Sequence, residues 1–298
     1  HKETSATLNQ TPPFLQPAPF AVDFISNKMF GGGSSWWSAT RLTDARMQFN
    51  QTNAETSVST THEFDHNDGV AVNGLSGSTN FMGYMWKRAP GYFDCVAYSG
   101  NSTAGRTVSH NVLGVAPEMI WVKSRNAFEN WAVYHKGLNG GTTPENYYLN
   151  LDTTAAENTQ VGYWNNTAPT ASNFTVGTNP RLNDSAGNYI SYLFSTLAGV
   201  SKVGGYTGDG VNGKVIDCGF TSGARFVLAR RTDGVSGWFL FDSVRGITTA
   251  YDPYLFLNNT DAQATIDNII RPDSSGFALG EAGHLNQSGG SFIFYAIA

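Results

Sequence analysis

The sequence Y-L-N-L-D-T-T-A-A-E at Tyr148–Glu157 decides how the chain is divided, because related stretches occur twice more. Tyr254–Gln263 reads Y-L-F-L-N-N-T-D-A-Q, and a weaker copy at Arg46–Glu55 reads R-M-Q-F-N-Q-T-N-A-E. In each copy, two alternating apolar positions lead into a polar turn with Thr and Ala at fixed places. The copies start 102 and 106 residues apart. The repeating unit therefore has the size of a domain, and the chain is predicted to be three variations on one module.

Short runs of β-branched and aromatic residues, separated by Gly, Asn and Asp, fill each repeat. Val22–Ile25, Met119–Lys123 and Phe226–Leu228 occupy the same place in their copies. Such runs are typical of strands joined by turns, and no sustained 3.6-residue apolar period predicts a helix. About seven short strands in about 100 residues predict an all-β chain of tandem antiparallel β-sandwich modules, jelly-roll-like or immunoglobulin-like in size, with little helix.

The strand runs divide the chain into an N-terminal segment and three modules. Residues 1–19 contain Pro12-Pro13 and Pro17-Ala18-Pro19, which exclude a regular helix or a central strand, so an extended arm or linker is expected. The three modules are predicted at residues 20–92, 93–200 and 201–298. Modules 2 and 3 share a lead-in, F-D-C-V-A-Y-S-G-N and S-K-V-G-G-Y-T-G-D. Module 1 shows no such lead-in, so it is the divergent copy.

Charge and composition narrow the class of partner. The net charge is −5 and only 14% of the residues are charged. No block of Lys or Arg is present, so nucleic acid is not an expected partner, because neutralised phosphates supply most of that affinity. No apolar run approaches the roughly 18 residues of a membrane span, and the N-terminus lacks the layout of a signal peptide. Cys95 and Cys218 fall at non-equivalent places in the repeat. They are expected to be free buried thiols of a protein folded in a reducing cytoplasm.

Three stretches of module 2 carry a resemblance to a known kind of protein. They are Y-S-G-N at Tyr98–Asn101, T-V-S-H at Thr107–His110 and V-A-P-E-M-I-W-V-K at Val115–Lys123. Together they resemble a module common in virion proteins of tailed bacteriophages, and those of aquatic and cyanobacterial phages come closest. Module 3 resembles the same family through stretches such as G-W-F-L-F-D-S at Gly237–Ser243. The resemblance covers residues 93–298 well and module 1 weakly. It implies a structural or host-adhesion part of a virion, and it supplies no catalytic residues.

Aromatic residues at repeated positions are predicted to pack the module cores, because a position kept aromatic in three copies of one fold most simply serves packing. One such set is Trp37, Trp131 and Trp238, and the other is Phe81, Tyr189 and Phe292.

Aromatic residues present in only one copy are the candidates for binding. They are Trp36 beside a triple glycine, Tyr163 and Trp164 in a polar insert of module 2, and Tyr251 in a loop of module 3. An exposed aromatic ring flanked by Asn and Asp can stack on a sugar while the polar side chains bind its hydroxyls. The alternative for each is a lid on the core or a contact with a partner chain.

Catalytic motifs are absent from the sequence. It contains no Gly-x-Ser-x-Gly elbow, no His-Glu-x-x-His and no phosphate-binding glycine loop before a helix. His62 and His66, with acidic neighbours, have the only conceivable metal spacing, but they lie in a polar loop where a solvated turn is expected. No metal or cofactor is therefore predicted. Glycoside hydrolysis needs only two carboxylates, and nothing singles out Asp152, Glu157 or Asp65 for that role.

The leading hypothesis is a non-enzymatic surface protein of a virion, assembled in the host cytoplasm. It would be a tail-fibre or head-surface appendage that contacts other virion proteins and adheres to host surface glycan. Fibre proteins are often trimers. The resemblance therefore implies a homo-oligomer, and a trimer is the form expected from the family alone. One alternative is a capsid decoration or tail-assembly protein that binds only virion proteins. A second is a polysaccharide depolymerase. Fold alone does not choose among them.

Overall fold

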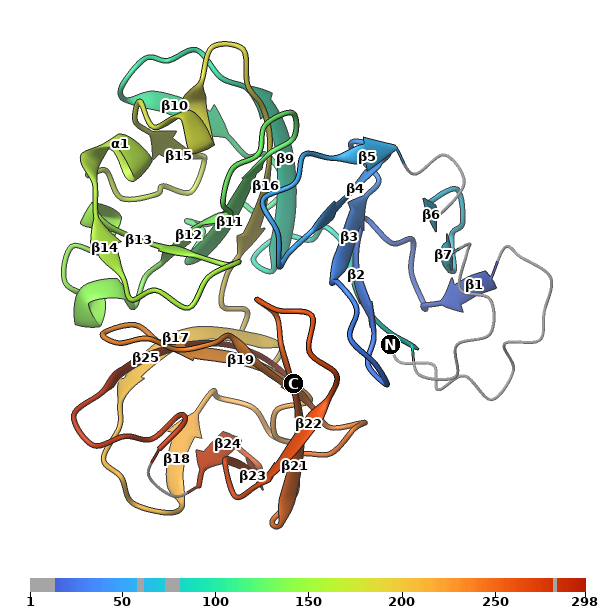
Figure 1. Ribbon diagram of the computed structural model, residues 1–298, viewed down its shortest axis with the longest axis vertical. Coiled ribbons are helices and arrows are strands. Elements are labelled where there is room, and N and C mark those ends of the chain that lie inside the picture. Colours follow the sequence, from blue (N-terminus) through green and yellow to red (C-terminus); the bar gives the residue numbers. More distant parts are fainter. Residues whose placement is uncertain (1–13, 58–61, 73–80, 281–282) are drawn as a thin grey trace.

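The computed structural model describes residues 14–57, 62–72, 81–280 and 283–298. The predicted all-β architecture is confirmed, with 42% of the chain in strands and 6% in helices. Antiparallel sheets in chain order form three lobes around a common centre, with module 1 in blue, module 2 in green and module 3 in orange (Figure 1).

Each module consists of a larger sheet and a smaller one. In module 1 the larger sheet has the order β5 (Thr56–Ser57), β4 (Ala45–Gln48), β3 (Trp37–Thr40), β2 (Phe24–Met29), β8 (Phe81–Trp86). Its smaller sheet has the order β1 (Phe14–Pro17), β7 (Gly69–Val72), β6 (His62–Glu63).

Module 2 repeats this plan with one more strand in the larger sheet. The order is β14 (Asn158–Thr159), β13 (Tyr147–Asn150), β12 (Ala132–His135), β11 (Met119–Ser124), β16 (Asn188–Phe194), β9 (Phe93–Ser99). The smaller sheet pairs β10 (Arg106–Ser109) with β15 (Asn173–Val176). The short helices of the module are η1 (Leu138–Gly141), η2 (Pro144–Asn146), α1 (Val161–Trp164) and α2 (Pro180–Asn183).

Module 3 has the same order in its larger sheet as module 2. The strands are β17 (Ser201–Thr207), β25 (Ser291–Ile297), β19 (Phe226–Arg231), β20 (Phe239–Asp242), β21 (Tyr251–Phe256) and β22 (Ala264–Asp267). The smaller sheet has the order β18 (Lys214–Asp217), β24 (Gly276–Leu279), β23 (Ile270–Asp273).

The predicted N-terminal arm of residues 1–19 is too long. β1 pairs with β7 in module 1 as β10 pairs with β15 and β18 with β24, so residues 14–17 belong to module 1. Pro17 ends an edge strand, where a missing N–H donor is tolerated. Residues 1–13 lie outside the described part of the chain.

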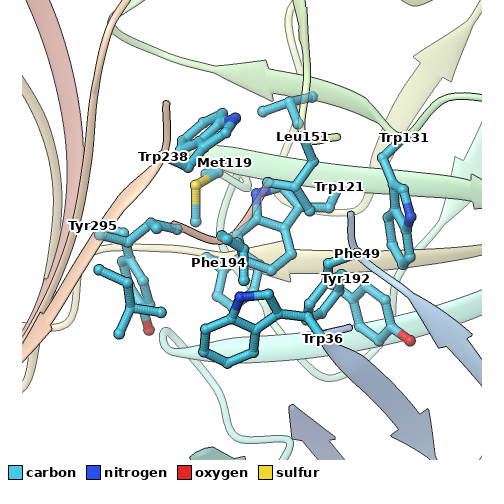
Figure 2. Close-up of a cluster of buried hydrophobic side chains, with 14 of the residues drawn as sticks. Trp36, Phe49, Met119, Trp121, Trp131, Leu151, Tyr192, Phe194, Trp238 and Tyr295 are labelled. Atoms are coloured by element: carbon cyan, nitrogen blue, oxygen red, sulfur yellow. The ribbon is translucent and has the colours of Figure 1, made fainter. Parts of the chain in front are cut away.

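The larger sheet of each module is buried on both faces. In module 2, Val122 and Leu193 pack towards the smaller sheet with Phe174, whereas Trp121 and Tyr192 face the centre of the molecule. All six residues of β11 are therefore buried. The central faces of all three modules meet in one shared hydrophobic core (Figure 2). The tandem modules are thus packed around a common centre.

Three tryptophans close this arrangement into a ring. The indole N–H of Trp36 donates to Phe256 O of module 3 at 2.8 Å, and that of Trp131 donates to Gln48 O of module 1 at 2.8 Å. The indole N–H of Trp238 donates to Asn150 O of module 2 at 3.1 Å. Each module therefore donates to the next in one direction, which is a pseudo-threefold pattern.

The predicted set of Trp37, Trp131 and Trp238 needs one correction. Trp131 and Trp238 are buried as expected, but Trp36 takes the matching place in module 1 and is 0% exposed. Trp37 is only half-buried, beneath the guanidinium of Arg46. The backbone hydrogen bonds identify Trp36 as the counterpart. The backbone N–H of Trp36 donates to Asn50 Oδ1, just as the backbone N–H of Trp238 donates to Asn258 Oδ1. The second predicted core set is confirmed: Phe81, Tyr189 and Phe292 are buried.

A buried cation accompanies each tryptophan. Lys28, Lys123 and Arg230 are the fifth residues of β2, β11 and β19, and all three are at most 1% exposed. Each donates to a backbone carbonyl in the turn of the next module. The acceptors are Asn259 O at 3.3 Å, Thr52 O at 3.0 Å and Thr153 O at 2.9 Å, in that order. The turns of the repeated ten-residue stretch therefore serve as sockets for a neighbour's cation.

The stability of the ring is expected to depend on pH through Lys28. Burial lowers the pKa of Lys28 from 10.5 to about 8, so between these values the unfolded chain holds more protons than the folded one. Stability rises with pH wherever the unfolded state binds more protons. The cost of the buried ammonium is fully present below pH 8 and is relieved as the pH rises towards 10.5. The free energy of unfolding of the wild type should therefore increase relative to Lys28→Met across this window. Denaturant unfolding of both chains at several pH values checks this, and a constant difference would contradict it.

Candidate functional site

Tyr163 and Trp164 do not reach solvent, contrary to the expectation of exposed stacking aromatics. They are 1% and 2% exposed. The ring of Tyr163 stacks on Tyr148 with centroids 3.8 Å apart, and its hydroxyl accepts from Arg181 Nη1 at 2.6 Å. Trp164 packs edge-on against Tyr134. Both side chains of α1 point into the core between the two sheets of module 2, so they support the surface above them and do not bind from it.

The other two predicted binding residues, Trp36 and Tyr251, lie in opposite environments, one buried and one exposed. Trp36 lies in the shared core, with its indole bonded to module 3, so the prediction of a binding role on the surface is wrong for this residue. Tyr251, at the start of β21, is 66% exposed. It is the one member of the four whose ring is open to solvent.

A polar pocket of about 360 Å³ lies above α1, within the range of small-molecule sites, which is about 300–1,000 Å³. Its walls come from η2, β13, β14 and α1, and the last three are labelled at the left of Figure 1. The lining residues are Thr143, Asn146, Tyr147, Thr159, Gln160, Val161 and Asn166. None of them carries a formal charge, so the pocket suits a neutral ligand.

The backbone around this pocket adopts a rare conformation at several points. Thr143 and Asn166, which line it, have φ values of 45° and 47°, and nearby Asn139 and Asn165 have 51° and 53°. A positive φ is tolerated by Asn but is an outlier for a β-branched residue such as Thr. Left-handed residues of this kind cost about 1–3 kcal/mol each and cluster at functional sites. Their concentration marks the pocket as a built feature of module 2.

The pocket offers side-chain amides that are free to bind. Within the described residues, no hydrogen bond occupies the side-chain amides of Asn146 and Asn166. Gln160 has one acceptor contact, from Asn179 Nδ2 to its Oε1 at 3.2 Å, so its amide donors remain available. Each amide supplies two donors and one carbonyl acceptor. The ring of Tyr147 stands beside them, half-buried.

In the described parts of modules 1 and 3, no helix corresponds to η2 or α1, two of the elements that build the pocket. The connection from β12 to β13 contains η1 and η2 and is longer than the corresponding connections, β3 to β4 and β20 to β21. Where module 2 has α1, module 1 has the strand β6 and module 3 has the strand β23. The sequence analysis correctly drew attention to this insert, but the residues that it proposed for binding, Tyr163 and Trp164, are buried. The spacing of Asn and Gln residues in a chain so rich in polar residues gave no signal for the pocket itself.

Two of the three carboxylates considered for hydrolysis, Asp152 and Glu157, have structural partners. Asp152 accepts from the backbone N–H of Trp131 at 3.2 Å and from Asn130, which is the place of Asn50 and Asn258 in the other modules. Burial raises the pKa of Asp152, and that of Glu157 as well.

Glu157 contributes to the junction between modules 2 and 3. Its carboxylate accepts from Asn139 N–H at 2.8 Å and from Thr232 Oγ1 at 3.3 Å. Asp65 is an exposed residue of module 1, between β6 and β7. Asp152 and Glu157 thus have structural roles in the fold, and Asp65 lies in a different module from both.

The histidine pair of module 1 is not simply a solvated turn. His62 lies on β6 and is buried, with its Nε2 3.1 Å from Asn27 Nδ2. Burial, together with the charge of Arg46, lowers the pKa of His62 to about 4. No group of three His, Cys, Asp or Glu side chains is arranged to hold a metal in the part of the chain that the structure describes. Cys95 and Cys218 are both free and buried.

Residues 90–298 match the model of a protein family described as Domain of unknown function (DUF7483). The match begins just before β9 and takes in modules 2 and 3 completely, which is more than half of the chain. The chain belongs to the DUF7483 family. The DUF7483 match includes the polar pocket and leaves out all the strands of module 1. A comparison with curated proteins found no match. Among the described residues, no helix is long and apolar enough to cross a membrane.

Proposed function

We propose that this chain is a non-enzymatic surface protein of a tailed-phage virion that adheres to host glycan through the polar pocket of module 2. The observation that carries the proposal is the neutral pocket with free amides, built in part by η2 and α1, which have no counterpart among the described residues of the other two modules. The resemblance of modules 2 and 3 to phage virion modules supports the setting. In that setting other virion proteins hold the chain on the particle.

The chemistry of the pocket favours a neutral sugar. A sugar hydroxyl both donates and accepts, which matches the donors and the acceptor that each amide provides. Asn146 and Asn166 can bind hydroxyls from two sides of the pocket, and the ring of Tyr147 can pack against the apolar face of the sugar. No Lys or Arg lines the pocket, so an acidic sugar would find no charged partner there.

Asn166→Asp is expected to weaken glycan binding about tenfold. The replacement keeps the shape of the side chain and tolerates the positive φ of 47°, but it removes two N–H donors and adds a charge. A lost hydrogen bond is worth about 1 kcal/mol and its unpaired partner somewhat more, and about 1.4 kcal/mol is a factor of ten in affinity. Retention of the purified chain on immobilised host envelope polysaccharide measures the effect.

Asn212→Asp is the matched control, because Asn212 is an exposed turn residue of module 3 and the variant adds the same charge. The Asn212→Asp variant should bind the polysaccharide as the wild type does. Because the proposed function is non-enzymatic, incubation with the wild type should release no new reducing ends from the polysaccharide. Equal retention of the Asn166→Asp and Asn212→Asp variants would contradict the assignment of the pocket. Absence of any binding to host cells or polysaccharide would contradict the adhesion function itself.

A further inference from the structure

As far as the structure describes it, the larger sheet of module 1 has one strand fewer at one edge than the sheets of the other two modules. β9 pairs with β16 over seven residues in module 2, and β17 pairs with β25 over seven residues in module 3. The counterpart of β16 and β25 in module 1 is β8, which pairs with β2 on one side. Among the described residues, no strand lies along the other side of β8. We call this side the β8 edge.

The backbone of β8 is oriented for a further strand. In module 2, Ser195 N–H donates to Tyr92 O where β16 meets β9. Alternation along an antiparallel ladder then puts the backbone groups of Leu193 on the β9 side. The matching residue of β8 is Met85, with Gly83 two positions earlier. Edge groups that no described strand pairs with are a template for pairing with another chain.

A largely apolar cavity of about 410 Å³ lies along the β8 edge, at the junction of modules 1 and 3. Met85 and Trp86 line it from β8, and Phe226 and Asp242 line it from module 3. At the junction of modules 2 and 1 the corresponding space is filled. Cys95 of β9 lies there fully buried, with its Sγ 3.7 Å from the hydroxyl oxygen of Thr40. Thr40 is the last residue of β3, and its counterpart in module 3 is Asp242, the last residue of β20.

The sequence in front of β1 does not have the residues that fill this place elsewhere. Six residues separate β9 from β10 and β17 from β18, and the same spacing before β1 points to residues 1–7, H-K-E-T-S-A-T. The third residue of β9 and of β17 is apolar and fully buried, whereas the sequence has Glu3. A glycine follows each strand, and a Cβ on Gly100 would lie 1.9 Å from Asp184 O. The sequence has Leu8 at that position.

We propose that the β8 edge accepts an extended strand of a partner protein, which adds antiparallel to β8 and completes the larger sheet of module 1. Strand addition takes its affinity from main-chain hydrogen bonds and its specificity from alternate side chains. β9 and β17 define those side chains as a small apolar residue at the third position and Tyr at the sixth. Tyr98 stacks on Tyr189, and Tyr206 on Phe292, each at 5.1 Å. Phe81 is their counterpart on β8 and would receive the partner's aromatic ring.

A synthetic peptide that copies Phe93–Ser99, with Cys95→Val as in β17, is the probe for this site. Fluorescence anisotropy with the full chain should give saturable binding. A peptide of the same composition in scrambled order, which breaks the alternation, should not bind. Hydrogen exchange at the amides of Gly83 and Met85 should slow at least tenfold when the copying peptide is added, because these groups become paired.

Val244→Lys tests the cavity without touching the core. Val244 lines the cavity and is 52% exposed, and Val215, on β18, is 49% exposed and serves as the matched site for Val215→Lys. Val244→Lys should weaken peptide binding at least tenfold, and Val215→Lys should leave it unchanged. The proposal is overturned if the peptide does not bind the full chain. It is equally overturned if the amides of Gly83 and Met85 already exchange slowly in the free chain, since the chain's own residues would then cover the edge.

Discussion

Trp36→Ala is expected to lower the free energy of unfolding by about 3–5 kcal/mol, the usual cost of removing a large buried aromatic side chain. The side chain is 0% exposed and stacks on Tyr84 with centroids 6.2 Å apart. Its removal also leaves Phe256 O without the indole donor, which breaks one of the three bonds that close the ring. Because the core is shared by all three modules, the variant should still unfold in one transition, shifted as a whole. Denaturant unfolding followed by tryptophan fluorescence and by circular dichroism measures both the shift and the coincidence.

Trp37→Ala is the control for that experiment, because the two tryptophans are neighbours in the sequence but differ in environment. Trp37 is half-buried, with the Arg46 guanidinium 4.1 Å from its ring centroid. Such a contact contributes about 0.5–1 kcal/mol at an exposed site, so this variant should lose about 1 kcal/mol. If the two variants were equally destabilised, Trp36 would not be the ring-closing residue of module 1.

Arg230→Met is expected to destabilise the chain by about 3–5 kcal/mol, because three carbonyl oxygens lose their donor and each buried group left unsatisfied costs about 1–3 kcal/mol. The guanidinium is fully buried and donates to the carbonyl oxygens of Asn150, Thr153 and Ala155 in the turn of module 2. Methionine keeps much of the stem but supplies no donor, so these carbonyls lose their partner in the interior. Burial lowers the pKa of Arg230 to about 10, and the side chain is therefore protonated at neutral pH.

Arg231→Met separates this effect from a simple loss of charge. Arg231 is the next residue, pairs with Asp233 at the surface and is joined to it at 2.6 Å. Exposed ion pairs contribute about 0–1 kcal/mol, so Arg231→Met should be nearly neutral in chemical unfolding. A loss of similar size in both variants would show that the turn of module 2 does not depend on the buried cation.

The repeated modules were predictable because their requirements are local. The alternation in Y-L-N-L and Y-L-F-L places Leu149, Leu151, Leu255 and Leu257 on one face of a strand, and all four are buried. The turn that follows was correctly assigned to the fold, since Asp152 accepts the same bond as Asn50 in module 1. Charge is therefore not required at that position.

The closed ring was harder to predict, although the sequence contained a signal for it. A strand with one solvated face alternates, whereas a strand buried on both faces reads as a continuous apolar run. M-I-W-V at Met119–Val122 and F-I-F-Y-A-I at Phe292–Ile297 are such runs. The basic residue at the same position of β2, β11 and β19 was a second signal. The pairing of Trp36 with Asn50 was not visible, because 14 residues separate them and the corresponding pair in module 2 is 21 apart.

The pocket could not be predicted, because its lining comes from two separate segments, residues 143–147 and 159–166, that meet only in the folded module. The sequence placed candidate binding residues at Tyr163 and Trp164, close to Asn166, which lines the pocket. The aromatic side chains chosen there are buried, since α1 turns them towards Tyr148 and Tyr134. Which face of a four-residue helix points to the core depends on the sheets beneath it, and not on the helix itself.

The assignment of glycan binding to module 2 is tested most directly by nuclear magnetic resonance of the side-chain amides in the full chain. The chain would be titrated with a panel of neutral hexoses and N-acetylhexosamines. At least one sugar is expected to shift the side-chain amide signals of Asn146, Gln160 and Asn166 together, and the Asn166→Asp variant should lose the shifts of the other two. A panel sugar that binds but shifts signals only elsewhere in the chain, or a panel that shifts none of the three amides, would contradict the assignment.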